Sequence, residues 1–148
     1  MVTQEMVKNA YAALMSGDMN EIKKYWDENM VWTVPGHNVL SGKYYGLDAF
    51  VGFMSNVGAM SANSFNMESI TICVNDEYSA DVTRNVGYRA GYNGTGTKPY
   101  TMLDIDVIHL LRWKDGKVIE GKGAIFGNGT TEYDQFWSPI KEDSNRLD

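Results

Sequence analysis

The spacing of apolar residues changes once along this chain, near residue 65, and this change restricts the folds that the chain can adopt. Before that point, apolar residues recur at intervals of three and four, which predicts helices. After it, they alternate with polar residues in runs that predict long strands. Helices followed by strands, without regular alternation of the two, indicate the α+β class.

Glycine, proline and capping residues divide the first part into elements. Gly17 ends a first predicted helix, and Asp18 caps a short second helix whose apolar face includes Ile22, Tyr25 and Trp26. The pattern then predicts a strand over 30–34, an irregular loop after residue 36, and a third helix from residue 48 to residue 60.

The second part reads as a meander of strands. The predicted strands are 65–74, 78–88, 100–113 and 117–127, with turns at 75–77 and 114–116. In the second strand, Tyr78, Ala80, Val82, Val86 and Tyr88 alternate with Ser79, Asp81, Thr83 and Asn85, as in a half-buried strand. A short closing helix follows residue 131. We expect one domain over residues 1–140 and a polar C-terminal tail over 141–148.

Composition excludes several classes of function. The net charge of −6 and the absence of a basic cluster argue against a nucleic-acid partner. The single cysteine permits no internal disulfide and no cysteine-based zinc site. Neither a signal peptide nor an apolar stretch long enough for a membrane span is visible, so we expect a cytoplasmic protein without a membrane partner.

Three polar residues of the chain are candidates for chemistry. His109 can donate, accept or shuttle a proton near neutral pH, although a core histidine bonded to backbone carbonyls is the alternative. Asp104 and Asp106 lie two residues apart, so they project from one face of a strand, about 7 Å apart at Cα. Simple alternation places them opposite His109, and they share its pocket only if a bulge intervenes. The alternative, a solvated or dimer-facing pair of carboxylates, is the more frequent outcome.

Other candidate sites are weaker. His37 follows Pro35-Gly36 in a loop, where a surface position is the more frequent outcome. Two histidines and an aspartate could bind iron, but no local spacing supports this, and we expect no metal. The run GYNGTGTKP lacks the lysine and helix of a phosphate loop, so it predicts a hairpin loop.

Several stretches together resemble the nuclear transport factor 2-like superfamily, and its SnoaL-like members in particular. IHLLRWKDGKVIEGKGAIFGN is similar to the last hairpin of that superfamily, AYAALMSGDMNEIKKYWDENMVWTVPG to its opening helices and first strand, SGKYYGLDAFVGFM to its third helix, and TTEYDQFWS to a C-terminal helix. The resemblance implies a cone-shaped, strongly curved antiparallel sheet, closed by N-terminal helices around a pocket, as in a cystatin-like α+β barrel. It also implies a homodimer formed through the outer face of the sheet.

The superfamily includes ketosteroid isomerases, and their functional residues are mostly replaced here. The oxyanion tyrosine of these isomerases corresponds to Ala10, and their basic aspartate corresponds to Val34. A second oxyanion donor of the isomerases, a protonated carboxylic acid, corresponds to His109. Isomerisation by their mechanism is therefore not expected.

Two further enzyme groups of the superfamily are matched only in part. The polyketide cyclases share "HL.R..DGK", which places their pocket histidine at His109, but their catalytic aspartate falls at Gly123 or Ala124. The epoxide hydrolases use an Arg-x-Asp pair and a second aspartate. Arg84 matches the arginine, whereas Val86 and Ala124 replace the carboxylates.

The resemblance and the residues together predict a small-molecule enzyme without a cofactor. We expect proton-transfer chemistry, such as cyclisation, isomerisation or dehydration, on a hydrophobic polyketide, terpenoid or aromatic metabolite. His109 would be the acid, base or oxyanion donor, with Asp104 or Asp106 as its partner. The expected ligand-binding residues are Tyr11, Leu14, Trp32, Val34, Phe53, Met54, Val107 and Phe126. A non-catalytic carrier of an apolar ligand and a dimerising module with a filled cone remain as alternatives.

Overall fold

The computed structural model of the chain describes residues 1–92, 101–127 and 129–138. Its elements are α1 (Gln4–Ser16), α2 (Met19–Ile22), β1 (Trp26–Val34), β2 (Gly42–Tyr45), α3 (Leu47–Met60), β3 (Asn66–Val74), β4 (Tyr78–Tyr88), β5 (Met102–Lys114), β6 (Lys117–Ile125) and α4 (Gly129–Trp137). This order confirms the α+β class. The predicted tail and most of the predicted glycine-rich loop lie outside the described residues.

All six strands form one sheet, in the order β2-β1-β6-β5-β4-β3. Neighbouring strands are antiparallel except β1 and β6, which are parallel, so the expectation of a purely antiparallel sheet is wrong. The last strand returns beside the first and runs in the same direction. Among the described residues, β2 and β3 remain the two edges, and no pairing closes the sheet into a barrel.

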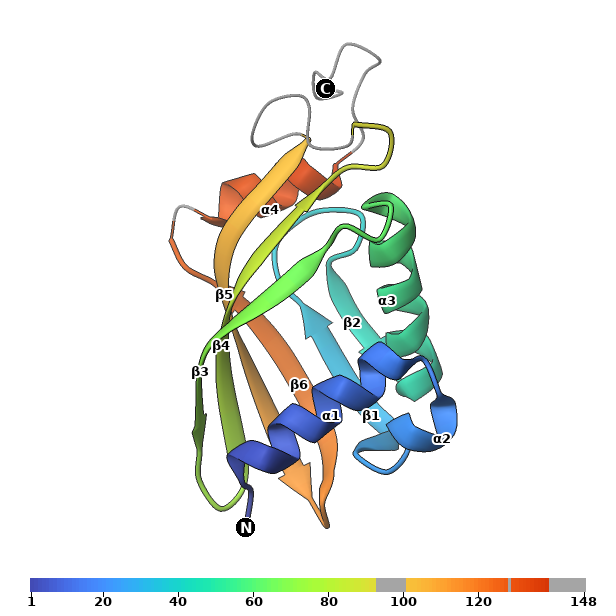
Figure 1. The fold of residues 1–148 in the computed structure, drawn as a ribbon, viewed down its shortest axis with the longest axis vertical. Coiled ribbons are helices and arrows are strands. Elements are labelled where there is room, and N and C mark those ends of the chain that lie inside the picture. Colours follow the sequence, from blue (N-terminus) through green and yellow to red (C-terminus); the bar gives the residue numbers. More distant parts are fainter. Residues whose placement is uncertain (93–100, 128, 139–148) are drawn as a thin grey trace.

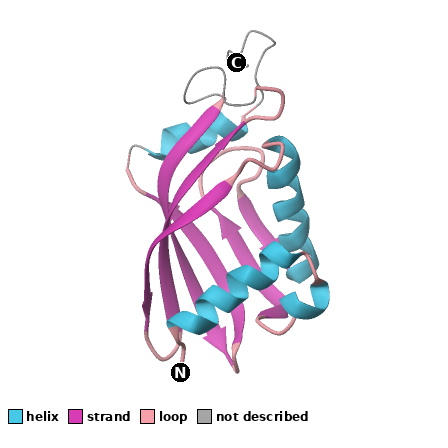
Figure 2. Ribbon diagram, viewed as in Figure 1, coloured by secondary structure: helices cyan, strands magenta, loops and turns pink. Residues whose placement is uncertain are grey.

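The helices lie around this strongly twisted sheet (Figures 1 and 2). α1 crosses one face and contacts β3, α3 packs on β1 and β2, and α4 packs on β5 (Figure 1). No helix in the described ranges is long and apolar enough to cross a membrane.

The predicted signals at the ends of α1 and α2 are present. Gly17 adopts a left-handed conformation with φ +68° and ends α1, as glycine readily does. The side chain of Asp18 accepts a hydrogen bond from the backbone of Asn20 and so caps α2. α2 nevertheless has only four residues, because Trp26 already belongs to β1. The Nε1 atom of Trp26 donates a 2.9 Å hydrogen bond to the carbonyl of Ala10, and this tertiary contact outweighs the local helical spacing.

The hairpin strands agree with the predicted ranges to within about two residues, whereas two predictions near the start are wrong. β1 begins four residues before the predicted strand at 30–34, and β2 forms within the stretch predicted as an irregular loop.

β4 and β5 pair without interruption from Tyr78 opposite Arg112 to Tyr88 opposite Met102. The bulge that would turn Asp104 and Asp106 toward His109 is therefore absent from this pairing.

An aromatic cluster fills the space between β1 and α3. The Trp32 ring lies 4.7 Å from Phe50 and 6.3 Å from Trp26, measured between centroids. Trp32 can lie there because β6 carries Gly121 opposite it, where a Cβ would collide with the indole ring. The absence of a side chain at Gly121 thus shapes the region beside His109.

Candidate functional site

The buried face of β4 is polar. Its inward side chains are Ser79, Asp81, Thr83 and Asn85, all buried, whereas the apolar residues between them are only partly buried. Alternation along the strand is as predicted, but the polar side of the strand faces the core. Since buried polar groups are costly without partners, each of these side chains needs a hydrogen bond.

The structure supplies these hydrogen bonds. Trp113 Nε1 donates to Ser79 Oγ at 2.9 Å, and Thr83 Oγ1 donates to Asn85 Oδ1 at 2.7 Å. Asp81 has two partners, one from α1 and one from β5. Each of the four side chains therefore takes part in at least one hydrogen bond.

Tyr11, Asp81 and His109 form one hydrogen-bonded cluster, which we call the Tyr11–Asp81–His109 cluster. His109 lies directly opposite Asp81 in the β4–β5 ladder, and its Nδ1 atom is 2.9 Å from Asp81 Oδ2. The hydroxyl of Tyr11, on α1, donates to the other carboxylate oxygen at 2.7 Å. Asp81 is 2% exposed and His109 is 7% exposed, so water screens this cluster poorly.

The cluster leaves one nitrogen of His109 unused. Nδ1 faces the Asp81 carboxylate, which favours a proton on that atom. Within the part of the chain that the structure describes, Nε2 makes no hydrogen bond. Nε2 is therefore the atom that can accept a proton from a bound molecule or, in the imidazolium, return one.

Burial fixes the protonation state of Tyr11. Removal from water, and then the negative charge of Asp81, raise the pKa of Tyr11 well above its ordinary value of 10.0. Tyr11 therefore remains a hydrogen-bond donor at neutral pH and holds the Asp81 carboxylate in place.

Aromatic and small residues surround His109. The Trp32 ring is 5.8 Å from the imidazole and the Tyr11 ring is 6.3 Å from it. Gly123 lies opposite His109 on β6, and a Cβ at Gly123 would be 3.7 Å from His109 Cδ2. The same Cβ would be 3.3 Å from the Pro35 ring, so Pro35 packs over Gly123 beside the imidazole.

Asp104 and Asp106 do not join this cluster, and the expectation that one of them is the partner of His109 is corrected. The uninterrupted ladder places both on the opposite face of β5. Asp104 binds Arg84 through two 2.8 Å hydrogen bonds, and Asp106 is exposed. Arg84, which matched the hydrolase arginine, belongs to the same outer face.

The expected ligand-binding residues fall into three groups. Leu14, Trp32, Val34 and Val107 are buried, and Tyr11, Phe53 and Met54 are partly buried. Phe126 follows the last residue of β6, Ile125, and is 54% exposed. Its place in the pocket wall stays a prediction. His37 is also exposed, and its backbone N–H donates to Asp134 on α4.

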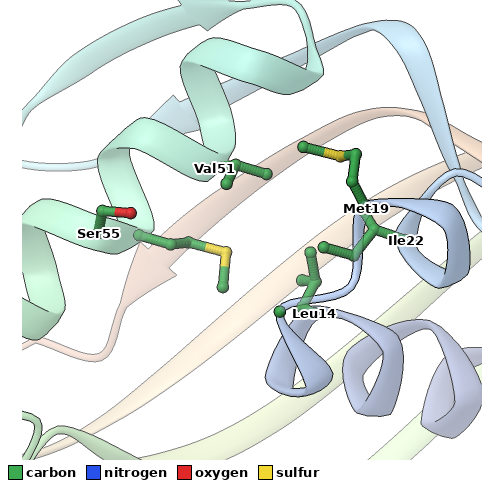
Figure 3. Close-up of a pocket in the computed structure, with 7 residues that line it drawn as sticks. Leu14, Met19, Ile22, Val51 and Ser55 are labelled. Atoms are coloured by element: carbon green, nitrogen blue, oxygen red, sulfur yellow. The ribbon is translucent and has the colours of Figure 1, made fainter.

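A small apolar pocket opens between α1, α2 and α3 (Figure 3). Its volume is about 200 Å³, and its lining residues are Leu14, Gly17, Met19, Ile22, Val51, Met54 and Ser55. Of these, Leu14 and Met54 were predicted. Leu14 follows Tyr11 by three residues on α1, so the pocket lies about one helical turn from the Tyr11–Asp81–His109 cluster. Within the described ranges, no group of three or more His, Cys, Asp or Glu residues could hold a metal ion.

Comparisons with known proteins agree with this architecture. A family model described as the SnoaL-like domain matches residues 7–121. The structure of Bal32a from a soil-derived mobile gene cassette is similar, at 26% identity and a TM-score of 0.76, over 90% of this chain and 94% of that one. No match was found among curated proteins.

Two more distant structures share the fold. An NTF2-like protein from Burkholderia xenovorans is 18% identical, with a TM-score of 0.71, over 90% of this chain and 98% of that one. TerC, co-crystallised with polyporic acid, is 14% identical, with a TM-score of 0.65, over 82% of this chain and 88% of that one.

Proposed function

Because the chain belongs to the SnoaL-like domain family, we propose that it is an enzyme that moves protons within a hydrophobic small molecule and uses His109 as the acid or base. The observation that carries this proposal is the pair formed by His109 Nδ1 and Asp81 Oδ2, 2.9 Å apart in the interior. A carboxylate in this position holds the imidazole in one tautomer and stabilises the imidazolium that forms when Nε2 takes a proton.

The proposed chemistry needs only proton movements. Nε2 of His109 removes a proton from a carbon next to a carbonyl group of the substrate, and the carbonyl oxygen takes up the negative charge. Where the enolate is conjugated with a double bond, the imidazolium, after exchanging its proton with solvent, can protonate the far carbon, which gives isomerisation. Attack of the enolate carbon on a second carbonyl gives cyclisation, and protonation of a departing hydroxyl gives dehydration.

The surroundings of the imidazole favour an apolar substrate. Trp32, Phe50 and Trp26 supply a continuous aromatic wall, and the pocket beside Leu14 is lined mainly by aliphatic and methionine side chains (Figure 3). Such walls bind an organic molecule by burial of apolar surface, while the few polar groups orient it. Co-crystallisation of TerC with polyporic acid supports a small organic ligand in this fold.

Native mass spectrometry of freshly purified protein, followed by incubation in D₂O, tests the proposal. We expect a co-purifying small molecule that gains deuterium, or is converted, when it is returned to the protein in D₂O. Proton abstraction and return at carbon exchange hydrogen for deuterium even where the net reaction is not yet known. A molecule recovered unconverted and without any gain of mass would contradict an enzymatic role.

A non-catalytic carrier is the second candidate, and the residues of β6 favour it. Where polyketide cyclases have a catalytic carboxylate, this chain has Gly123 or Ala124, and Gly121 also lacks a functional side chain. A carrier would bind the same molecule unchanged. Its affinity would not depend on the imidazole of His109, whereas turnover by an enzyme would.

We also propose that two copies of the chain pair through the outer face of the sheet. This face carries exposed Leu110 and partly buried Val82 and Ile108 beside charges of both signs, including the Arg84–Asp104 pair. Exposed apolar side chains among paired charges fit a second copy of the same surface.

A further inference from the structure

Residues 35–41 connect β1 to β2, and this segment begins beside His109. Gly123 lies opposite His109 on β6 and has no side chain. A Cβ at Gly123 would be 3.3 Å from the Pro35 ring and 3.7 Å from His109 Cδ2, so Pro35 and Cδ2 border the same small space. Cδ2 is bonded directly to Nε2. The segment therefore starts on the side of the imidazole ring where the unused nitrogen lies.

Hydrogen bonds within the segment make it a compact unit. Ser41 Oγ donates to the Pro35 carbonyl at 2.9 Å and accepts from the Asn38 N–H at 3.0 Å. The Leu40 N–H donates to Asn38 Oδ1 at 2.9 Å. Such local bonding lets residues 35–41 move together as one body.

A single carboxylate oxygen attaches this unit to another part of the protein. Asp134 Oδ1, on α4, accepts from the His37 N–H and from Asn38 Nδ2, each at 2.9 Å. Within the described ranges, every other hydrogen bond of residues 35–41 stays inside the β1–β2 hairpin. The segment and α4 lie at the same end of the sheet (Figure 1). Asp134 is therefore the polar tether of the segment.

Gly36 makes room for this tether. Its backbone is left-handed, with φ +87°, a conformation that glycine adopts without strain. A Cβ at this position would collide with Asp134 Oδ1. The absence of a side chain at Gly36 thus allows the carboxylate to reach the backbone of His37.

α4 provides a fixed base for the tether. Phe136 and Trp137, on its apolar face, are almost completely buried. The guanidinium of Arg89 donates to the Ser138 carbonyl at 2.8 Å, directly after the helix. Because α4 is held in this way, a movement that breaks the tether displaces residues 35–41 rather than the helix.

We infer that residues 35–41 form a lid over Nε2 of His109 and that Asp134 keeps this lid closed. Asp134 is thus a positioning residue, which acts through the segment and touches no reacting atom. Opening of the lid admits the substrate to the imidazole, and closing excludes water during proton transfer. The inference rests on the proposed function, because access to Nε2 has a role only where a molecule reacts there.

Chemical modification of the two histidines of the chain tests the lid. Diethyl pyrocarbonate attaches an ethoxycarbonyl group to an accessible neutral imidazole nitrogen, and peptide mass spectrometry measures the rate at each histidine. The exposed His37 is the internal reference. In the wild-type protein, we expect His109 to react about tenfold or more slowly than His37, because its Nε2 is reached only when the lid opens.

Asp134→Ala removes the acceptor of both hydrogen bonds that hold the lid. It should raise the rate at His109 about tenfold and leave the rate at His37 nearly unchanged. Asp134→Asn keeps a side-chain oxygen as an acceptor and should restore most of the protection. Thr131→Ala, at an exposed position of α4, is the matched control and should react like the wild-type protein.

Asn38→Asp tests the same tether from the side of the segment. Aspartate keeps the oxygen that accepts from Leu40, but it replaces the amide donor by a second carboxylate beside Asp134. This variant should also raise the rate at His109, and it decides the outcome if Asp134→Ala fails to fold. Amide hydrogen exchange in β5 should stay at the wild-type level in every variant, which excludes general unfolding.

The possible failures can be told apart. A wild-type His109 that reacts as fast as His37 would overturn the lid. An unchanged rate at His109 in Asp134→Ala and Asn38→Asp, or a rise that always accompanies faster exchange in β5, would overturn the role of Asp134. The modification needs no substrate, so a failure to incorporate deuterium would overturn the proposed function and leave the result for the lid in place.

Discussion

His109 and Asp81 face each other across the β4–β5 ladder, with Nδ1 and Oδ2 2.9 Å apart and both side chains almost completely buried. The carboxylate holds the imidazole in one orientation through this contact, and little water competes for either group. Because Nδ1 of His109 is bonded to Asp81, Nε2 is the ring nitrogen that can exchange a proton with a bound molecule.

Replacement of Asp81 by Asn should lower turnover by about a hundredfold or more, because the carboxylate that stabilises the imidazolium is lost while the shape is kept. Deuterium incorporation into the co-purifying molecule measures this effect. Asp104→Asn is the matched control. Asp104 pairs with Arg84 on the outer face, so the turnover of the Asp104→Asn variant should equal that of the wild-type protein. An equal loss of turnover in Asp81→Asn and Asp104→Asn would contradict the role of Asp81.

Replacement of Tyr11 by Phe should destabilise the protein by about 1–3 kcal/mol at pH 7, because the buried Asp81 oxygen loses its donor. This difference should shrink at high pH. Since the folded-state pKa of Tyr11 is raised above 10.0, the unfolded chain releases the proton first. The stabilisation is complete below pH 10 and is lost as the pH rises beyond it.

Urea unfolding of the wild-type protein and of Tyr11→Phe at pH 8, 10 and 11 measures this dependence. Other tyrosines are present in both proteins, so the comparison isolates Tyr11. A stability difference that stays constant from pH 8 to pH 11 would show that Tyr11 does not keep its proton in the folded state.

Substitution of Gly121 by Ala should destabilise the protein by about 1–3 kcal/mol, because the added Cβ collides with the Trp32 ring and contacts Leu111. Gly52 on α3 provides the control, since a Cβ there meets nothing within 4 Å. Gly52→Ala should stabilise the protein by about 0.5–1 kcal/mol through helix propensity. Thermal melting of both variants checks the prediction, and a stable Gly121→Ala would argue against tight packing beside His109.

Substitution of Leu110 by Glu tests the proposed pairing of two copies through the outer face. Leu110 is 36% exposed on that face, and a charge there would repel its counterpart or lie unpaired in the interface. Sedimentation analysis should show a wild-type dimer and a folded Leu110→Glu monomer. A wild-type monomer at micromolar concentration would rule out this pairing.

Much of the fold is predictable from local spacing, because helix ends and strand turns have local causes. Gly17 and Asp18 separate α1 from α2 as expected, and the hairpin strands begin and end close to the predicted residues. Trp26 departs from its helical spacing because its indole bonds to the carbonyl of Ala10, sixteen residues away. Such distant contacts are not visible in local periodicity.

The site is less predictable, for two physical reasons. Alternation defines two faces of a strand but does not say which is buried, and on β4 the buried face is the polar one. In addition, the connection between β4 and β5 is too long for the strand register to be counted from the sequence. The pairing of His109 with Asp81 therefore cannot be predicted from the sequence. Asp104 and Asp106 lie close to His109 in sequence, and for that reason they were the predicted partners.

Deuterium incorporation by wild-type protein and by His109→Gln tests the central claim most directly. Glutamine keeps a polar side chain of similar size but cannot act as a base at neutral pH. With the co-purifying molecule as substrate in D₂O, we expect a rate about a hundredfold or more lower for His109→Gln, with binding of the molecule retained. Equal rates in the two proteins would contradict the assignment of His109 as the proton-transferring residue.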